Sequence, residues 1–431
     1  MIRTPLIFAG TADVCGKFKG KAFPLDQMER RAVSGIGWTP TNVQITCFDA
    51  IAPSPFGALG DLVMVPDPAA VADVDYEDGL PPERLALADI RTSEGTAWNC
   101  CPRAILRAAL ARLKEVSGLV LRGAFEHEFQ LIGAPARPGL AYAAEGFRAQ
   151  AAFCGTLMAA LGQAGMAPDT MMKEYGANQF EVTIDPEDGL RIADTAVLLR
   201  EIVRATALRF GERATFTPIL DPSGVGNGVH IHMSLIDAGG KPAGWAADGP
   251  GGMSPVMASF VAGILRHAGA IVALTAPSAI SYDRLTPHRW SAAFNNLGLR
   301  DREAAVRICP GTGPAGFNVE YRAADAAASP YLALAAIVHA GAQGIADGLP
   351  APGITEEDLT LATPEALAAR GIAPLPQSLD AALARFEADA LVRSWFPAGF
   401  PEVYLAHKRG EIGALAGKSA GDRFAAYAEV Y

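Results

Sequence analysis

The chain has 431 residues, half of them hydrophobic, so it is long enough for one very large domain or several ordinary ones. Its formal net charge is −10 and it has no cluster of basic residues, which argues against nucleic acid or an anionic membrane surface as a partner. The longest uncharged run, residues 326–346, contains Ser329, Pro330 and His339, so we expect a buried helix and no membrane span. The six cysteines show no metal-binding spacing, which favours reduced thiols in a cytoplasmic protein.

Residues 1–70 are expected to form β structure with turns. Asn42–Phe48 alternates as a strand does, and this strand would end at Asp49. Residues 62–65 predict a short strand that the following prolines stop, and the acidic residues 71–95 predict a surface excursion. Asp49 has two interpretations: a turn residue that closes a strand, which is the commoner case, or a carboxylate that a loop delivers to a site.

A helix is predicted from Arg103 to Glu115, with Pro102 at its first position. We place a domain boundary here, between a small N-terminal domain (residues 1–102) and a large C-terminal domain (residues 103–431). Periodicity predicts further helices at 146–164, 194–210, 254–274 and 331–343 and in the tail 375–431, and a strand at 214–220.

Two segments of the large domain place carboxylates on strands. Glu126 and Glu128 share one face of a strand at residues 123–131, where they repel each other unless a cation lies between them. A divalent metal is the simplest such cation. The alternative is a solvent-facing pair, which the apolar neighbours disfavour. Glu174 and Glu181 follow on two strands separated by a glycine-containing kink.

The most informative segment is a glycine turn that runs into the alternating residues 229–235. Because side chains two apart in a strand point the same way, His230, His232 and Ser234 share a polar face. Such a face suits a metal or a phosphate, whereas the alternative is a strand that merely turns its polar side to solvent. Downstream lie five closely spaced arginines that suggest an anion-binding wall, with scattered surface arginines as the alternative for the second and third of them: Arg284, Arg289, Arg300, Arg302 and Arg307.

Taken together, the candidate ligands are five carboxylates and one histidine: Glu126, Glu128, Glu174, Glu181, Glu320 and His230. Oxygen-rich ligand sets favour Mg²⁺ or Mn²⁺ over zinc. Two such ions together with arginines are typical of sites that bind ATP and transfer a phosphoryl group. The chain has no P-loop and no kinase glycine loop, so an ATP site here is of another kind.

At this point the sequence resembles the glutamine synthetase superfamily over nearly its whole length. The motifs that carry the resemblance are Glu-x-Glu (126, 128), Glu…Gln-x-Glu (174…179, 181), Gly-x-Gly-x-His-x-His-Met-Ser (226–234) and Glu-x-Arg (320, 322). The resemblance implies an α+β protein: a small β-grasp domain, then a large catalytic domain with an antiparallel sheet and flanking helices. It also implies stacked rings, such as a dodecamer of two hexamers, with active sites between neighbouring subunits.

The same resemblance implies roles for individual residues. Glu128, Glu174 and Glu181 would hold one metal ion, and Glu126, His230 and Glu320 the other. Gly226, Arg284 and Arg322 would bind glutamate; His232, Ser234, Arg302 and Arg307 would serve ATP and the transferred phosphoryl group, Arg302 with a catalytic role. Asp49 from the next subunit would face the incoming amine as a second catalytic residue, with Tyr175 lining the amine pocket. The implied reaction makes γ-glutamyl phosphate, from which an amine displaces phosphate.

The sequence departs from glutamine synthetases at several positions. Their flap glutamate, which shields the intermediate, is Trp290 here, and a Trp suits packing against an organic amine or its cation. An asparagine before the glycine motif is Val225, and two cationic positions before Glu-x-Arg are Ala315 and Asn318. The favoured hypothesis is therefore a γ-glutamyl–amine ligase acting on glutamate, ATP and a small amine. The alternatives are a glutamine synthetase that uses ammonia and a non-catalytic ring-forming scaffold or sensor.

Overall fold

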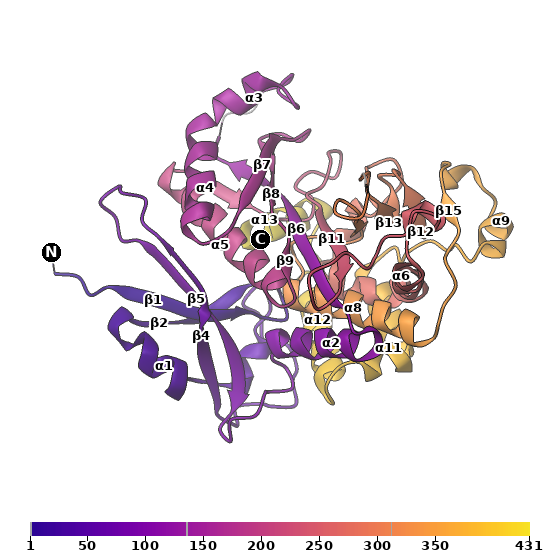
Figure 1. The fold of residues 1–431 in the computed structure, drawn as a ribbon. Helices are drawn as coiled ribbons and strands as arrows, with labels where there is room; N and C mark the ends of the chain where they lie inside the picture. Colours follow the sequence, from indigo (N-terminus) through magenta and orange to yellow (C-terminus); the bar gives the residue numbers. More distant parts are fainter. Residues whose placement is uncertain (1, 135–136, 312) are drawn as a thin grey trace.

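The computed structural model describes residues 2–134, 137–311 and 313–431, and it shows two β-sheets with helices packed around the larger one (Figure 1). The smaller sheet has the strand order β2-β1-β5-β4-β3. Its β1 and β5 run parallel, and its other neighbouring strands are antiparallel. Its elements are β1 (Leu6–Ala12), β2 (Phe18–Pro24), α1 (Met28–Ser34), β3 (Ile36–Trp38), β4 (Leu62–Val74) and β5 (Glu83–Thr92).

Three expectations for this region were wrong. The strand that begins at Leu62 is not stopped by the prolines but continues to Val74. The pairing with β5 shifts register between Pro66 and Val71, so the prolines, which have no N–H donor, lie where regular strand pairing is interrupted. Residues 71–95 therefore form the end of β4, an exposed turn and β5, paired in the sheet with side chains such as Leu85–Ala88 buried, and not a surface excursion. The expected strand Asn42–Phe48 is replaced by a 3-10 helix over Pro40–Gln44, which begins at Pro40 after the Thr39 cap.

The larger sheet has the order β15-β12-β13-β14-β11-β6-β8-β7, with β9 and β10 paired to β6. It is antiparallel at its centre, whereas β12 runs parallel to β13 and β15 at one edge. Its strands are β6 (Val120–Ile132), β7 (Pro168–Lys173), β8 (Gln179–Ile184), β9 (Glu187–Asp188), β10 (Arg213–Thr215), β11 (Val229–Ile236), β12 (Phe294–Leu299), β13 (Ala304–Ile308), β14 (Val319–Tyr321) and β15 (Ile354–Thr355). The expected strand at 214–220 is thus shorter than predicted.

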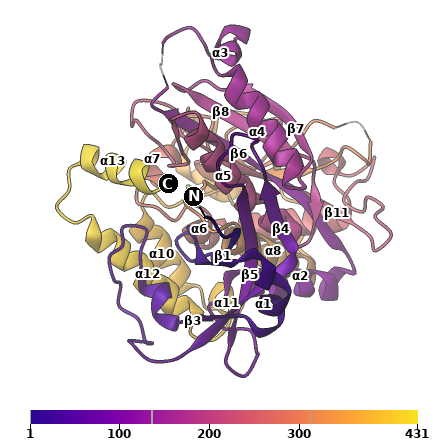
Figure 2. The same cartoon turned by 90° about the vertical axis from the view of Figure 1, so that its left-hand side faces the viewer.

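Helices cover this sheet, and most lie where periodicity places them: α2 (Pro102–Ser117), α5 (Arg191–Arg209), α6 (Pro255–Thr275) and α8 (Pro330–Ala346). The helix expected at 146–164 divides at Gln150 into α3 (Ala144–Ala149) and α4 (Ala151–Gln163). Short helices α7 (Ser281–Arg284) and α9 (Pro364–Ala369) lie between strands, and the tail forms α10 (Leu379–Ala388), α11 (Ala390–Ser394), α12 (Phe400–Ala414) and α13 (Ala420–Val430). In the tail, α10 packs against α6 and α12, and α12 reaches the N-terminal region, where His407 Nδ1 lies 2.7 Å from the Val43 carbonyl oxygen (Figure 2).

The core helices α6 and α8 pack closely through two glycines. A Cβ atom on Gly263 would lie 2.1 Å from the Ala340 carbonyl oxygen, and one on Gly344 would lie 2.1 Å from the Ser259 carbonyl oxygen. Within the described residues, α6 is the one helix long and apolar enough to cross a membrane by composition, and 72% of its most apolar window is buried inside the fold.

A buried ion-pair network at α2 joins the small sheet to helices α5 and α8. Arg103 is 2% exposed and binds Asp194 on α5 through two N–H···O contacts of 2.9 Å. Its other donors reach Asp67 on β4 at 2.7 Å and Asp89 on β5 at 3.3 Å. Tyr331 on α8 donates to Asp194 at 2.7 Å. One guanidinium thus connects the small sheet to the helices behind the large one.

Candidate active site

The central strands of the large sheet bring a histidine pair against two carboxylates. Strand register places His230 opposite Glu126 and His232 opposite Glu320. His230 Nδ1 lies 2.6 Å from Glu126 Oε1, and His232 Nε2 lies 3.0 Å from Glu320 Oε2. One donor atom each from Glu126, His230 and Glu320 falls within 4.8 Å of the others. The sheet itself therefore assembles a set of oxygen and nitrogen donors that can surround a single ion.

A second group of possible donors shares His230 with the first. Glu128 on β6 is directly opposite Glu181 on β8, and their donor atoms lie within 4.8 Å of each other and of His230. Glu128 Oε2 accepts hydrogen bonds from the Gly228 N–H at 2.7 Å and from Gln179 Nε2 at 3.2 Å. Gln179 had no predicted role in the site; its place two residues before Glu181 on the same strand face is the signal that could have found it.

The carboxylates crowd one another strongly. Burial and the nearby charges of Glu126, Glu128 and Glu174 raise the pKa of Glu181 to about 9, and burial also raises the pKa of Glu128. Such a cluster must bind protons or a cation. Carboxylate oxygens with a single imidazole are donors that suit Mg²⁺ or Mn²⁺, so the residues present fit the divalent ions expected from the sequence.

Glu174 lies somewhat apart from these donors. Its Oε2 accepts hydrogen bonds of 2.9 Å from the Tyr142 hydroxyl and from the Tyr175 N–H. Among the described residues, the three groups of possible metal donors do not include Glu174. Glu174 was predicted to share a metal ion with Glu128 and Glu181, but the structure groups these two with His230. The charge of Glu174 still raises the pKa of Glu181.

Divalent cations are expected to stabilise the folded protein. A ligand that binds only the folded state at 100 times its Kd adds about 2.7 kcal/mol, which raises the melting temperature. Melting curves with MgCl₂ or MnCl₂, against NaCl of equal ionic strength, measure this effect. Glu181→Gln removes one donor charge and is expected to lose most of the shift. If NaCl raises the melting temperature as much as the divalent salt does, or if the divalent salt raises that of the variant equally, the cluster does not bind the ion.

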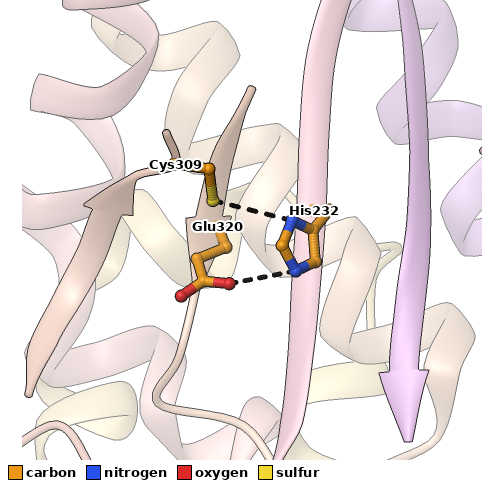
Figure 3. A group of neighbouring side chains, drawn as sticks. All are labelled: His232, Cys309 and Glu320. Carbon is orange, nitrogen blue, oxygen red and sulfur yellow. Dashed lines mark hydrogen bonds and ion pairs between the residues drawn. The ribbon is translucent and has the colours of Figure 1, made fainter. Parts of the chain in front are cut away.

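A third group surrounds His232 and includes a thiol (Figure 3). The His232 Nδ1 atom lies 2.9 Å from Asn318 Oδ1 and 3.7 Å from Cys309 Sγ, while its Nε2 faces Glu320. Burial alone would lower the pKa of His232, but its contacts with Cys309, Glu126 and Glu320 raise it well above the ordinary value. Cys309 was not predicted to lie in the site, since a lone cysteine after a short strand carries no spacing signal.

A cavity of about 530 Å³ opens beside this group. Its wall includes Glu126, Glu181, His232, Ser234 and Asn318. This volume lies within the range of small-molecule sites. The Ser234 hydroxyl donates to the Phe317 carbonyl at 2.9 Å, which fixes the loop before β14 at the cavity edge.

Two arginines meet at Glu320. Arg307 Nε lies 2.6 Å from Glu320 Oε1, and Arg322 Nη1 contacts the same oxygen. Although burial opposes it, contacts with His232 and Arg322 hold the pKa of the Glu320 carboxyl well below its usual range. Arg322 also donates from Nε to the Arg302 carbonyl at 2.9 Å. Arg307, predicted to serve ATP, and Arg322, predicted to bind glutamate, thus contact the same carboxylate.

Arg284 is packed against the glycine turn. A Cβ atom on Gly226 would lie 2.6 Å from Arg284 Cδ, and one on Gly228 would lie 2.7 Å from Arg284 Nη2. Only glycine leaves room for the guanidinium at these positions. Arg284 is 3% exposed, and its Nη1 has no hydrogen-bond partner within the described part of the chain. A buried guanidinium with a free donor is a natural partner for a substrate carboxylate.

Three further predicted residues, Trp290, Tyr175 and Arg302, lie around the rim. Trp290 and Tyr175 meet edge to face, with ring centroids 5.3 Å apart and planes at 81°. Tyr142 lies at the same rim and was missed, because the irregular segment before α3 gave no pattern. All three aromatic side chains are about half exposed. Arg302 is exposed nearby, and its charge acts on the Tyr142 hydroxyl.

Asp49 is exposed on the turn after the 3-10 helix, with a left-handed φ of 57°. Its N–H donates to the Thr46 carbonyl at 3.2 Å, and the adjacent Phe48 ring packs on Tyr427 at 5.0 Å. In the described part of the chain, no hydrogen bond or ion pair joins Asp49 to the glutamate and histidine groups. The Asp49 carboxylate thus has no direct polar partner among the described groups of its own chain.

A family model described as the glutamine synthetase catalytic domain matches residues 99–427. A second, described as the glutamine synthetase N-terminal domain, matches residues 3–98. The chain belongs to the glutamine synthetase family. The resemblance inferred from the motifs is thus confirmed, as is the α+β class with a small N-terminal β domain and a large catalytic domain. A glutamine synthetase family chain of this kind is an ATP-dependent ligase that forms C–N bonds.

Individual relatives are similar over nearly the whole chain. Gamma-glutamylpolyamine synthetase GlnA3 of Streptomyces coelicolor is 34% identical over 422 residues, covering 94% of this chain and 89% of its own. A glutamate–isopropylamine ligase of a Pseudomonas species is 26% identical and covers 94% of this chain and 90% of its own. A solved structure described as a novel glutamine synthase homolog is 39% identical, with a TM-score of 0.92, and covers 100% of this chain and 99% of its own.

Proposed function

We propose that this glutamine synthetase family enzyme joins the γ-carboxylate of glutamate to an organic amine at the expense of ATP. The observation that carries the proposal is the aromatic pair Trp290 and Tyr175 at the rim of the site. Ammonia is small and strongly hydrated and gains little from such a wall, whereas an alkyl or aryl amine gains apolar and cation–π contact. The relatives named for polyamine and isopropylamine substrates support the same interpretation.

The reaction needs activation, because a carboxylate is a poor acyl donor. A γ-carboxylate oxygen of glutamate attacks the γ-phosphorus of ATP, and ADP leaves. The amine nitrogen then attacks the acyl carbon of γ-glutamyl phosphate, inorganic phosphate leaves, and the nitrogen loses a proton. Arg284, beside Gly226, would bind the α-carboxylate of glutamate, and Arg322 would complete the same pocket.

The carboxylate groups would hold the metal ions. Glu126, His230 and Glu320 would hold one, and Glu128 and Glu181, together with Glu174 or His230, the other. When bound, Mg²⁺ or Mn²⁺ supplies charge that neutralises the nucleotide phosphates during transfer. His232, Ser234, Arg302 and Arg307 would face the nucleotide and the transferred phosphoryl group.

The site is proposed to be completed by another copy of the chain. Asp49 is exposed and, within the described residues, makes no hydrogen bond or ion pair with the carboxylate groups of its own chain, as expected of a residue donated to a neighbouring subunit. There it would accept the proton of the incoming amine, and the assembly would be a ring such as a dodecamer of two hexamers in the cytoplasm.

Phosphate release with glutamate, ATP and Mg²⁺ tests the proposal directly. The panel is ammonia, methylamine, ethanolamine, isopropylamine, aliphatic polyamines and aromatic amines. We expect an organic amine to give the highest kcat/KM, and Trp290→Ala to raise the KM for that amine about tenfold or more through lost contact. Ammonia as the best substrate would instead identify a glutamine synthetase. No turnover with any amine, despite nucleotide binding, would indicate a scaffold or sensor.

A further inference from the structure

The loop that carries Trp290 has an unfavourable backbone conformation. His288 has a φ of 61° and Trp290 a φ of 53°, which is the left-handed region that bulky residues avoid. Both side chains are exposed, so packing of their rings does not force this conformation. A loop of this kind persists only when its surroundings hold it in place.

One carboxylate supplies that restraint. The two oxygens of Glu303 each accept a backbone hydrogen bond, from the His288 N–H at 2.9 Å and from the Trp290 N–H at 3.1 Å. On the other side, the Trp290 carbonyl accepts from Arg322 Nη2 at 3.2 Å. The peptide groups on either side of the Trp290 Cα are thus held by Glu303 and by Arg322.

Glu303 is itself well anchored. It lies on the short turn between β12 and β13, where its own N–H donates to Asp301 Oδ1 at 2.8 Å. Arg322 donates to the carbonyl of the preceding residue, Arg302, at 2.9 Å. The carboxylate is therefore presented from a fixed turn of the sheet, whereas the loop that it holds has few other constraints. Arg289 adds two, by donating to the Pro222 carbonyl at 2.7 Å and to the Gly224 carbonyl at 3.1 Å, and His288 Nε2 lies 3.4 Å from the Thr360 hydroxyl.

We propose that Glu303 is a positioning residue for amine specificity: it holds the loop so that the Trp290 ring stands against Tyr175 and forms the amine-binding wall. This inference rests on the proposed function. Glu303 does not touch the reacting atoms. Its effect is transmitted through the backbone of Trp290, so it acts mainly on the binding of the organic amine. Arg322 holds the same loop from the other side, but its contacts with Glu320 and the Arg302 carbonyl do not involve Glu303.

The test compares Glu303→Ala and Glu303→Gln with a matched control, Glu356→Gln. Glu356 lines the same cleft behind the loop, and within the described residues its carboxylate has no hydrogen bond or ion pair. We expect Glu303→Ala to raise the KM for the organic amine about tenfold or more and to leave the KM of ATP and glutamate within about twofold. Glu303→Gln, which keeps one acceptor oxygen, should give a smaller rise in the same direction.

A second readout does not depend on turnover. Arg289 lies inside the held loop, so release of the loop is expected to speed tryptic cleavage after Arg289 in Glu303→Ala, while Glu356→Gln matches the wild type. Unchanged amine KM and unchanged cleavage in both Glu303 variants would overturn the inference. Faster cleavage in an enzyme that prefers ammonia would instead show that the loop restraint is real and that the proposed function is wrong.

Discussion

Glu128→Gln is expected to lower turnover by about 10³-fold while leaving the metal-free protein at least as stable as the wild type. The loss follows because a metal ligand that stabilises charge in the transition state contributes several kcal/mol, and an amide is a much weaker ligand than a carboxylate. The gain in stability follows because burial raises the pKa of Glu128 beside Glu181, so removing its charge relieves repulsion.

The substitution is chosen to separate chemistry from folding. Glutamine keeps the side-chain shape and an oxygen that can still accept the Gly228 N–H hydrogen bond of 2.7 Å. Steady-state kinetics and a melting curve without added metal give the two quantities. Glu187 lies on β9 and pairs with Gly123 on β6. The Glu187→Gln variant therefore serves as a control for the loss of a carboxylate elsewhere on the same sheet. Activity of Glu128→Gln near the wild-type level would show that the proposed metal assignment is wrong.

Arg103→Leu is expected to reduce the free energy of unfolding by about 3–5 kcal/mol, since it leaves a buried acid without its partner. Asp194 is 3% exposed and would lose both of its 2.9 Å contacts with the guanidinium. The same guanidinium helps to hold the pKa of Asp67 below its usual range, against the effect of burial. Because the pKa of Asp67 is lower in the folded state, its contribution to the free energy of unfolding is fully present above the pKa of the unfolded state. This contribution is lost as the pH falls through the pKa of the folded state.

One turn further along α2, Arg107 offers a matched control. It pairs with Asp89 at 3.0 Å, but its side chain is 48% exposed. An exposed pair of this kind contributes about 0–1 kcal/mol, so Arg107→Ala is expected to be nearly neutral. Denaturant unfolding of both variants at one salt concentration makes the comparison. Equal effects from Arg103→Leu and Arg107→Ala would contradict the role given to the buried network.

Local pattern located the strands that carry the site. In β6 and β11 the alternation of apolar and polar residues determines which side chains share a face. The sequence alone therefore predicts that Glu126 and Glu128 lie on one face of β6, and that His230 and His232 lie on one face of β11. The strand β4 and the 3-10 helix that begins at Pro40 were misjudged. In β4 the tertiary sheet overrides local signals, because a register shift accommodates prolines that normally end a strand.

Apart from Gln179 on β8, the parts of the site that pattern missed come from irregular segments or strand ends. Tyr142 belongs to a loop without periodicity and is held at the rim by its hydroxyl hydrogen bond to Glu174 at 2.9 Å and by its N–H bond to the Lys173 carbonyl at 3.0 Å. Cys309 and Glu303 are adjacent to β13, and their importance depends on contacts made across the sheet with His232 and with the Trp290 loop. Such contacts are set by the tertiary fold and not by the spacing of residues along the chain.

The proposed function depends above all on the acceptor being an organic amine. A competition in one vessel tests this: the enzyme with glutamate, ATP and Mg²⁺, and equal concentrations of ammonium, isopropylamine and a short aliphatic diamine, with the products separated and quantified by mass spectrometry. The Trp290–Tyr175 wall can pack against the carbon atoms of an organic amine, whereas ammonia has no carbon to pack. We therefore expect the amount of γ-glutamylamide formed from an organic amine to exceed that of glutamine by about tenfold or more. Glutamine as the main product would contradict the proposed function.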